Sequence, residues 1–147
     1  MSDAIWFFAQ LECRHCGRLC AEDAGRLYSD GLNPGFGDEA RRLGESFSAG
    51  EENLRDAYVA LRAPSPDERV RVIERWECPN CGRIQWARIA LVREGPTWYR
   101  FLGAESVDLS PEVLADAHYL SRRLDFDLLD IPAGELQVLK DMIPATD

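Results

Sequence analysis

Two cysteine motifs constrain this chain more than any other feature of its sequence. Residues 13–18 read CRHCGR and residues 78–83 read CPNCGR, with residues 17–77, which number 61, between Cys16 and Cys78. In each motif two residues separate the cysteines, so one turn directs both sulfurs at a common point, and a glycine follows where the chain folds back. Two motifs supply four thiolates, a complete tetrahedral ligand set. The sequence therefore predicts one structural Zn²⁺ per chain, bound by Cys13, Cys16, Cys78 and Cys81.

Two further side chains near the first motif are weaker candidates for the metal. Cys20 follows Cys16 by four residues, a poorer chelate, and we expect it to be a small apolar residue or a spare thiol. His15 lies inside the motif, and its ring is expected to point to solvent, with ligation as the alternative. Matched cysteine pairs favour metal binding in a reducing compartment over a disulfide framework, so the expected location is the cytoplasm.

The paired motifs resemble those of the zinc-ribbon and rubredoxin-like superfamily. The resemblance covers residues 13–17, residues 78–82 and the strands beside them. It implies that two hairpin knuckles clamp one metal ion and that a three-stranded sheet follows. Well-known members bind nucleic acid or carry electrons. This chain departs from the usual pattern in the long segment between its motifs and in its acidic C-terminal part.

Alternating apolar residues predict strands on both sides of each motif. The expected strands cover residues 4–13, 67–78, 84–92 and 97–102, with a turn at residues 94–96; a short return strand is one interpretation of residues 18–28. Aromatic and β-branched residues dominate these runs. The pattern predicts an antiparallel meander that begins at the metal.

Helical spacing predicts the remaining elements. Leu54, Ala57, Tyr58 and Leu61 share one face of a helix expected over residues 51–62. A second helix is expected to start at Ser110 and continue to residue 124, and a third covers residues 131–143. The predicted fold class is therefore α+β: a zinc-ribbon-like antiparallel sheet with an inserted helix between the knuckles and a C-terminal helical pair.

We expect a single domain over residues 1–147. Residues 1–28 and 67–104 are assigned to the sheet, residues 29–66 to an insertion, and residues 105–147 to an acidic helical tail packed on the sheet. Within the insertion, residues 38–50 are polar and hold two glycines, so a mobile binding loop is the alternative there. No apolar run approaches the length of a membrane span, and the N-terminus has no features of a signal peptide.

The charge of the chain is concentrated near its C-terminus. The net charge is −9; residues 105–147 hold ten acids and three bases, a balance of −7, whereas residues 1–104 hold 16 acids and 14 bases, a balance of −2. This balance argues against phosphate-rich partners and predicts a basic protein partner, with solubility alone as the rival explanation. The acids expected to contact that partner are Asp125, Asp127, Asp130 and Glu135.

These features predict a non-enzymatic, zinc-binding protein-interaction module, with an inhibitor or immunity-type role as one form. Four thiolates leave no coordination position for water, and the sequence has no nucleophile elbow or phosphate-binding glycine loop. One alternative is a nucleic-acid- or transcription-associated zinc ribbon, because arginines alternate with aromatic residues between positions 69 and 100. A second alternative is a rubredoxin-like iron electron carrier.

Overall fold

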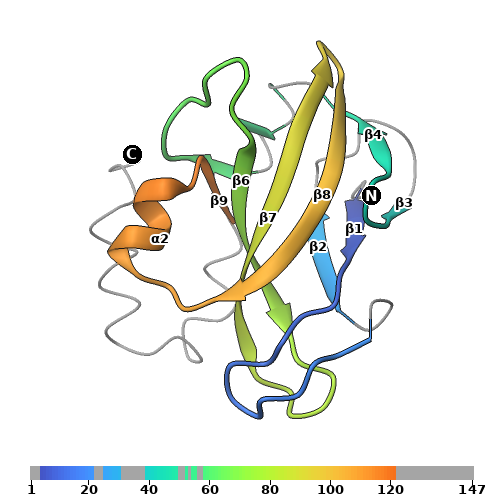
Figure 1. The fold of residues 1–147 in the computed structure, drawn as a ribbon, viewed down its shortest axis with the longest axis vertical. Helices are drawn as coiled ribbons and strands as arrows, with labels where there is room; N and C mark the ends of the chain where they lie inside the picture. The colour runs from blue at the N-terminus through green and yellow to red at the C-terminus, as the bar shows by residue number, and fades with distance from the viewer. Residues whose placement is uncertain are drawn as a thin grey trace.

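The computed structural model describes residues 4–21, 25–30, 39–49, 52, 54, 55 and 58–121, and this part of the chain is mostly β-structure (Figure 1). Its elements, in chain order, are strands β1 (Ala4–Phe8), β2 (Arg26–Asp30), β3 (Glu39–Arg41), β4 (Ser46–Ser48), β5 (Tyr58–Ala60), β6 (Val70–Glu77), β7 (Ile84–Gly95) and β8 (Trp98–Val107), helix α2 (Pro111–Asp116) and strand β9 (Tyr119–Ser121).

The strands form two sheets. The smaller sheet has the order β2-β1-β3, with β1 antiparallel to β2 and parallel to β3. The larger sheet has the order β4-β8-β7-β6-β9-β5, in which β6 and β9 are parallel and the other neighbours are antiparallel. The meander expected after residue 67 is confirmed in β6, β7 and β8, with the β7–β8 turn near Gly95.

One face of the larger sheet packs against the smaller sheet. Phe7 of β1 contacts Phe101 of β8, with ring centroids 4.9 Å apart, and meets Phe47 of β4 edge-on at 5.4 Å. Three alternate residues of β7, Ala87, Ile89 and Leu91, are buried in the same core. This arrangement follows from the alternation of apolar residues, since successive side chains of a strand point to opposite faces.

Helix α2 covers part of the opposite face. Leu114 of α2 is buried in a second core cluster with Ile73, Trp86 and Leu120 of the sheet. The expected start of the helix is confirmed: the Ser110 hydroxyl accepts a hydrogen bond from Val113 N–H at 3.2 Å, and Pro111 and Glu112 occupy the first turn.

The fold class predicted from the sequence is wrong. The helix expected to continue to residue 124 ends at Asp116, and the next residues form β9. His118 fixes this change, because its backbone N–H donates to Arg71 C=O at 2.9 Å and its Nδ1 accepts from Arg71 N–H at 3.0 Å. His118 is fully buried. The expected third helix, residues 131–143, lies outside the described residues.

The helix expected over residues 51–62 is wrong in its second half. Glu52, Leu54 and Arg55 have helical conformation, but Tyr58–Ala60 is strand β5, which pairs with β9. Leu54 and Tyr58 are both buried, as the apolar pattern requires, so the interior positions were predicted and the backbone conformation was not. Residues 39–48, part of the alternative binding loop, contain β3 and β4. No helix in the described ranges is long and apolar enough to cross a membrane.

Candidate metal centre

The two cysteine motifs lie side by side at one end of the molecule. Figure 1 shows the loop that follows β1 next to the loop between β6 and β7, at the bottom of the view. The first motif connects to the smaller sheet and the second connects two central strands of the larger sheet. The motifs therefore meet where the two sheets converge.

The motifs have the same backbone hydrogen bonds. In the first, Cys13 N–H donates to Arg18 C=O at 2.9 Å, and Gly17 N–H donates to Cys13 C=O at 3.0 Å. The second repeats both bonds around Cys78, at 3.0 and 2.8 Å. Gly17 and Gly82 have φ angles of 76° and 73°, a conformation that glycine adopts without strain. Each turn is thus a knuckle that holds its two cysteines on one side.

The four thiols form one compact cluster. The sulfurs of Cys13, Cys16, Cys78 and Cys81 all lie within 4.8 Å of one another, and the closest pairs, Cys13–Cys81 and Cys16–Cys78, are 3.5 and 3.8 Å apart. A tetrahedral ion with metal–sulfur bonds of about 2.3 Å requires sulfur separations of about 3.8 Å. A disulfide would bring two sulfurs to about 2.05 Å, and all four cysteines are free. The spacing fits a single four-coordinate metal ion.

Hydrogen bonds favour negative charge on the two buried sulfurs of the cluster, those of Cys13 and Cys78. Cys13 Sγ accepts from the backbone N–H groups of His15 and Cys16, at 3.4 and 3.3 Å, and from Gln85 Nε2 at 3.2 Å. Cys78 Sγ accepts from Asn80 N–H at 3.4 Å. Such donors stabilise a thiolate over a thiol. The surroundings of the cluster therefore favour the thiolate form, in which cysteine binds a metal ion.

The thiols differ in their tendency to ionise. Burial raises the pKa of Cys13, but the hydrogen bonds from Cys16, Gln85 and His15 outweigh it and lower the pKa from 9.0 to about 5. At Cys81 a backbone hydrogen bond from Arg83 lowers the pKa, but burial and the neighbouring thiols raise it to about 11. Four adjacent thiolates repel one another, so a central divalent cation is what allows all four to lose their protons.

Gln85 is a functional residue that the sequence analysis missed. It is buried on β7, and while its Nε2 donates to Cys13 Sγ its Oε1 accepts from Arg14 N–H at 2.8 Å. It thereby links the first knuckle to β7, the strand that directly follows the second knuckle. The available signal was an amide side chain among the apolar residues Ile84, Trp86 and Ala87, four residues after the last cysteine.

The weaker ligand candidates lie outside the cluster. Cys20 is buried in the main core, where its sulfur accepts from Leu11 N–H at 3.3 Å, and it behaves as the expected small apolar residue. His15 is exposed and contributes its backbone N–H. Neither belongs to the group of side chains close enough to share one ion in the described part of the chain.

The aromatic residues between positions 69 and 100, on which a nucleic-acid-binding ribbon would stack bases, are mostly buried. Trp76, Trp86 and Tyr99 lie in the two cores, and only Trp98, at 49% exposure, reaches the surface among them. Several arginines of the sheet pair with acids, such as Arg71 of β6 with Asp116 at 3.4 Å. These contacts agree with arginines that point outward around a buried core, with the exception of Arg75 of β6, which is buried. The expected partner-binding acids Asp125, Asp127, Asp130 and Glu135 lie outside the described residues.

Comparisons with family models, with curated proteins and with solved structures gave no significant match. The four-cysteine cluster is compatible with a zinc-ribbon-like site. Its knuckles are the part of the molecule that agrees with the resemblance noted in the sequence.

Proposed function

We propose that this protein is a non-enzymatic binding module whose four cysteines hold one structural Zn²⁺. The spacing of the four sulfurs supports this proposal most directly. Four cysteines are a common ligand set for structural zinc, and they fill a tetrahedral shell. No coordination position then remains for the water or substrate that a catalytic zinc needs. The ion serves to join chain segments.

The position of the cluster explains what the metal would stabilise. Cys13 and Cys16 lie between β1 and β2 of the smaller sheet, whereas Cys78 and Cys81 lie in the hairpin between β6 and β7. Residues 17–77 separate these pairs, so one ion closes a long loop and links both sheets at one end. The free energy of metal binding thereby adds to the free energy of folding.

The binding role rests on the acidic C-terminal part of the chain. Three of its acids already pair with arginines: Asp108 with Arg14, Asp116 with Arg71 and Arg88, and Glu105 with Arg88. Asp125, Asp127, Asp130 and Glu135 follow them in the sequence. We assign these four acids to a basic protein partner, in an inhibitor or immunity-type role, because complementary charge speeds association.

Replacing Asp125, Asp127 and Asp130 with asparagine should weaken capture of that partner by about tenfold, because charge complementarity across the contact is lost. The measurement is the association rate with the products of neighbouring genes, at several salt concentrations. The rate of the parent should fall as salt rises, since charges are screened beyond ~8 Å at physiological ionic strength. The melting temperature of the variant should equal that of the parent.

A second triple variant controls for net charge. Glu12, Asp67 and Glu77 are exposed acids elsewhere on the described surface, and changing them to Gln, Asn and Gln removes the same three charges. This variant should capture the partner as the parent does. Tight binding of mixed-sequence DNA or RNA by the parent, unchanged in the asparagine variant, would instead assign the function to a nucleic-acid-associated ribbon.

A rubredoxin-like electron carrier is the second candidate function. Cys16 and Cys81 are exposed, in contrast to Cys13 and Cys78, so the outer thiolates would bring an iron centre to the surface. The N–H···S hydrogen bonds also suit a redox-active metal, since they tune its potential. The identity of the bound metal separates this candidate from the first.

A further inference from the structure

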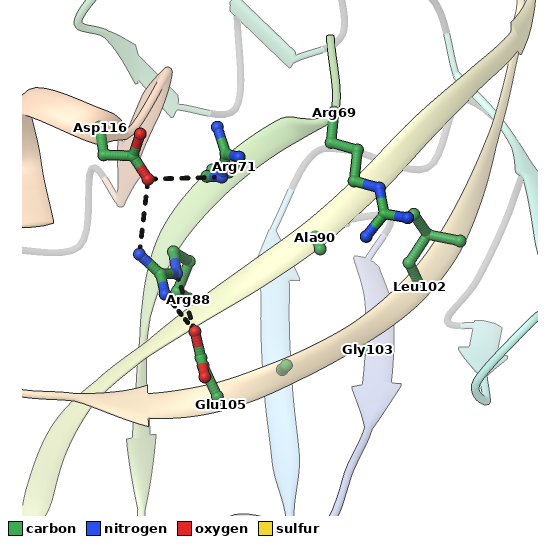
Figure 2. A pocket seen from close by; sticks show the side chains of 9 residues that line it. Arg69, Arg71, Arg88, Ala90, Leu102, Gly103, Glu105 and Asp116 are labelled. Atoms are coloured by element: carbon green, nitrogen blue, oxygen red, sulfur yellow. Dashed lines mark hydrogen bonds and ion pairs between the residues drawn. The ribbon is translucent and has the colours of Figure 1, made fainter.

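A hollow of about 430 Å³ lies on the face of the larger sheet that α2 only partly covers (Figure 2). Helix α2 packs over Trp86 and Val107, which pair with each other across β7 and β8. Farther along the same strands the face is open. The hollow there is lined by Arg69, Arg71, Arg88, Ala90, Leu102, Gly103, Ala104, Glu105 and Asp116.

Three arginines surround this hollow. Arg71 and Arg88 both approach one oxygen of Asp116, at 3.4 and 3.5 Å, and Arg88 also pairs with Glu105. Figure 2 shows Arg69 reaching over the hollow from the other side, towards Leu102. No ion pair or hydrogen bond engages the Arg69 guanidinium within the described ranges. One cation of the three is therefore available to a ligand.

The floor of the hollow is made of small residues. Ala90 of β7 and Gly103 and Ala104 of β8 line it, and Figure 2 shows Ala90 between Arg69 and Arg88. Gly103 has a φ angle of 129°, and the β7–β8 register shifts between Ala90 and Leu91, so the strands are irregular at this point. With no large side chain on the floor, a ligand can approach the sheet between the guanidinium groups.

We propose that this hollow binds a small phosphate monoester. Such a group carries about −1.5 to −2 charges at neutral pH and three acceptor oxygens, and guanidinium groups bind it through paired hydrogen bonds. A carboxylate or a phosphodiester carries a single negative charge. It therefore offers Arg71 and Arg88 no more charge than the carboxylate of Asp116 already does. A dianion can displace Asp116 and engage Arg69 as well. The volume lies within the usual range for small-molecule sites, about 300–1,000 Å³.

Asp116 is the internal competitor that two of the three arginines share, whereas among these three Glu105 pairs with Arg88 alone and Glu68 with Arg71 alone. Asp116 is the last residue of α2, where a negative charge opposes the helix dipole, and its side chain is about half exposed. It can therefore leave the arginines when a phosphate arrives. Removing its charge should strengthen phosphate binding, whereas removing the charge of Arg69 should weaken it. This site is separate from the metal cluster, and the proposal goes beyond the function proposed above.

The test is a titration of the full chain, followed by the backbone amide signals in NMR at constant ionic strength. Inorganic phosphate and adenosine monophosphate should both give saturable shifts centred on residues 88–90 and 102–105. Arg69→Gln should weaken both by about tenfold, the value of a lost charge-assisted hydrogen bond. Asp116→Asn should tighten both severalfold. Adenosine without phosphate should give no such shifts.

Two control variants match these charge changes outside the hollow. Arg93→Gln alters an exposed arginine of β7, whose Nε donates to Gly95 C=O, and Asp67→Asn alters an exposed acid. Both should bind phosphate as the parent does. Equal shifts with chloride, equal effects of Arg69→Gln and Arg93→Gln, or tighter binding of an oligonucleotide that lacks a terminal phosphate would each overturn the proposal. Arg69 is exposed, so its variant tests the site even if Asp116→Asn lowers stability.

Discussion

Replacing Cys78 with serine is expected to lower the melting temperature by about 15–20 °C, the shift that a loss of about 5 kcal/mol gives in a domain of this size. Cys78 is buried, and its sulfur lies 3.8 Å from that of Cys16 in the other knuckle. Serine cannot supply the thiolate, so the ion loses a ligand and the long loop between the knuckles loses its closure. The measurement is thermal unfolding of freshly purified protein, monitored by circular dichroism.

Cys20→Ser is the matched control for this prediction. Cys20 is also buried and undergoes the same chemical change, but it lies outside the cluster. Its sulfur accepts a hydrogen bond from Leu11 N–H, and a serine oxygen can accept the same bond. We expect a loss of about 1 kcal/mol or less. Equal destabilisation by the two changes would mean that burial, not metal binding, accounts for the importance of Cys78.

Replacing Trp86 with alanine is expected to cost about 3–5 kcal/mol of unfolding free energy. Trp86 is 4% exposed and lies in the core cluster that joins the sheet to Leu114 of α2. Its removal leaves a cavity beneath a helix of only six residues, which has few other contacts to hold it in place. Urea unfolding at equilibrium measures the change.

Trp98→Ala is the matched control, because it removes the same type of side chain from the first residue of β8. Trp98 is an exposed large hydrophobic residue, so its loss should cost about 1 kcal/mol or less. The two tryptophans therefore differ mainly in burial. Comparable losses for both variants would contradict the assignment of Trp86 to the core between the sheet and α2.

The features that were predicted from the sequence depend on local geometry. Each knuckle is a turn of six residues, and its cysteine spacing and glycine determine its shape without help from distant segments. The strands β6, β7 and β8 are long enough for alternation to show, and their short connections make neighbours in sequence into neighbours in the sheet. Local information was sufficient for these elements, whereas the grouping of the four cysteines, which a long segment separates, followed from the four ligands that a tetrahedral ion needs.

The features that were missed depend on distant pairing. Strands β5 and β9 have three residues each, too few for alternation to be distinguished from helical spacing. These strands form because β9 pairs in parallel with β6, and β5 pairs with the other edge of β9. The burial of His118 and its hydrogen bonds to Arg71 fix this arrangement. The role of Gln85 and the convergence of three arginines on one hollow likewise require the assembled sheet.

The central claim, that four cysteines bind one structural zinc, is tested most directly by elemental analysis of the freshly purified parent protein. We expect one equivalent of zinc per chain, and a clear loss of zinc in the Cys78→Ser variant but not in Cys20→Ser. One equivalent of iron with a visible thiolate absorbance would assign the cluster to the electron-carrier candidate. Less than half an equivalent of any metal in the parent would contradict the account.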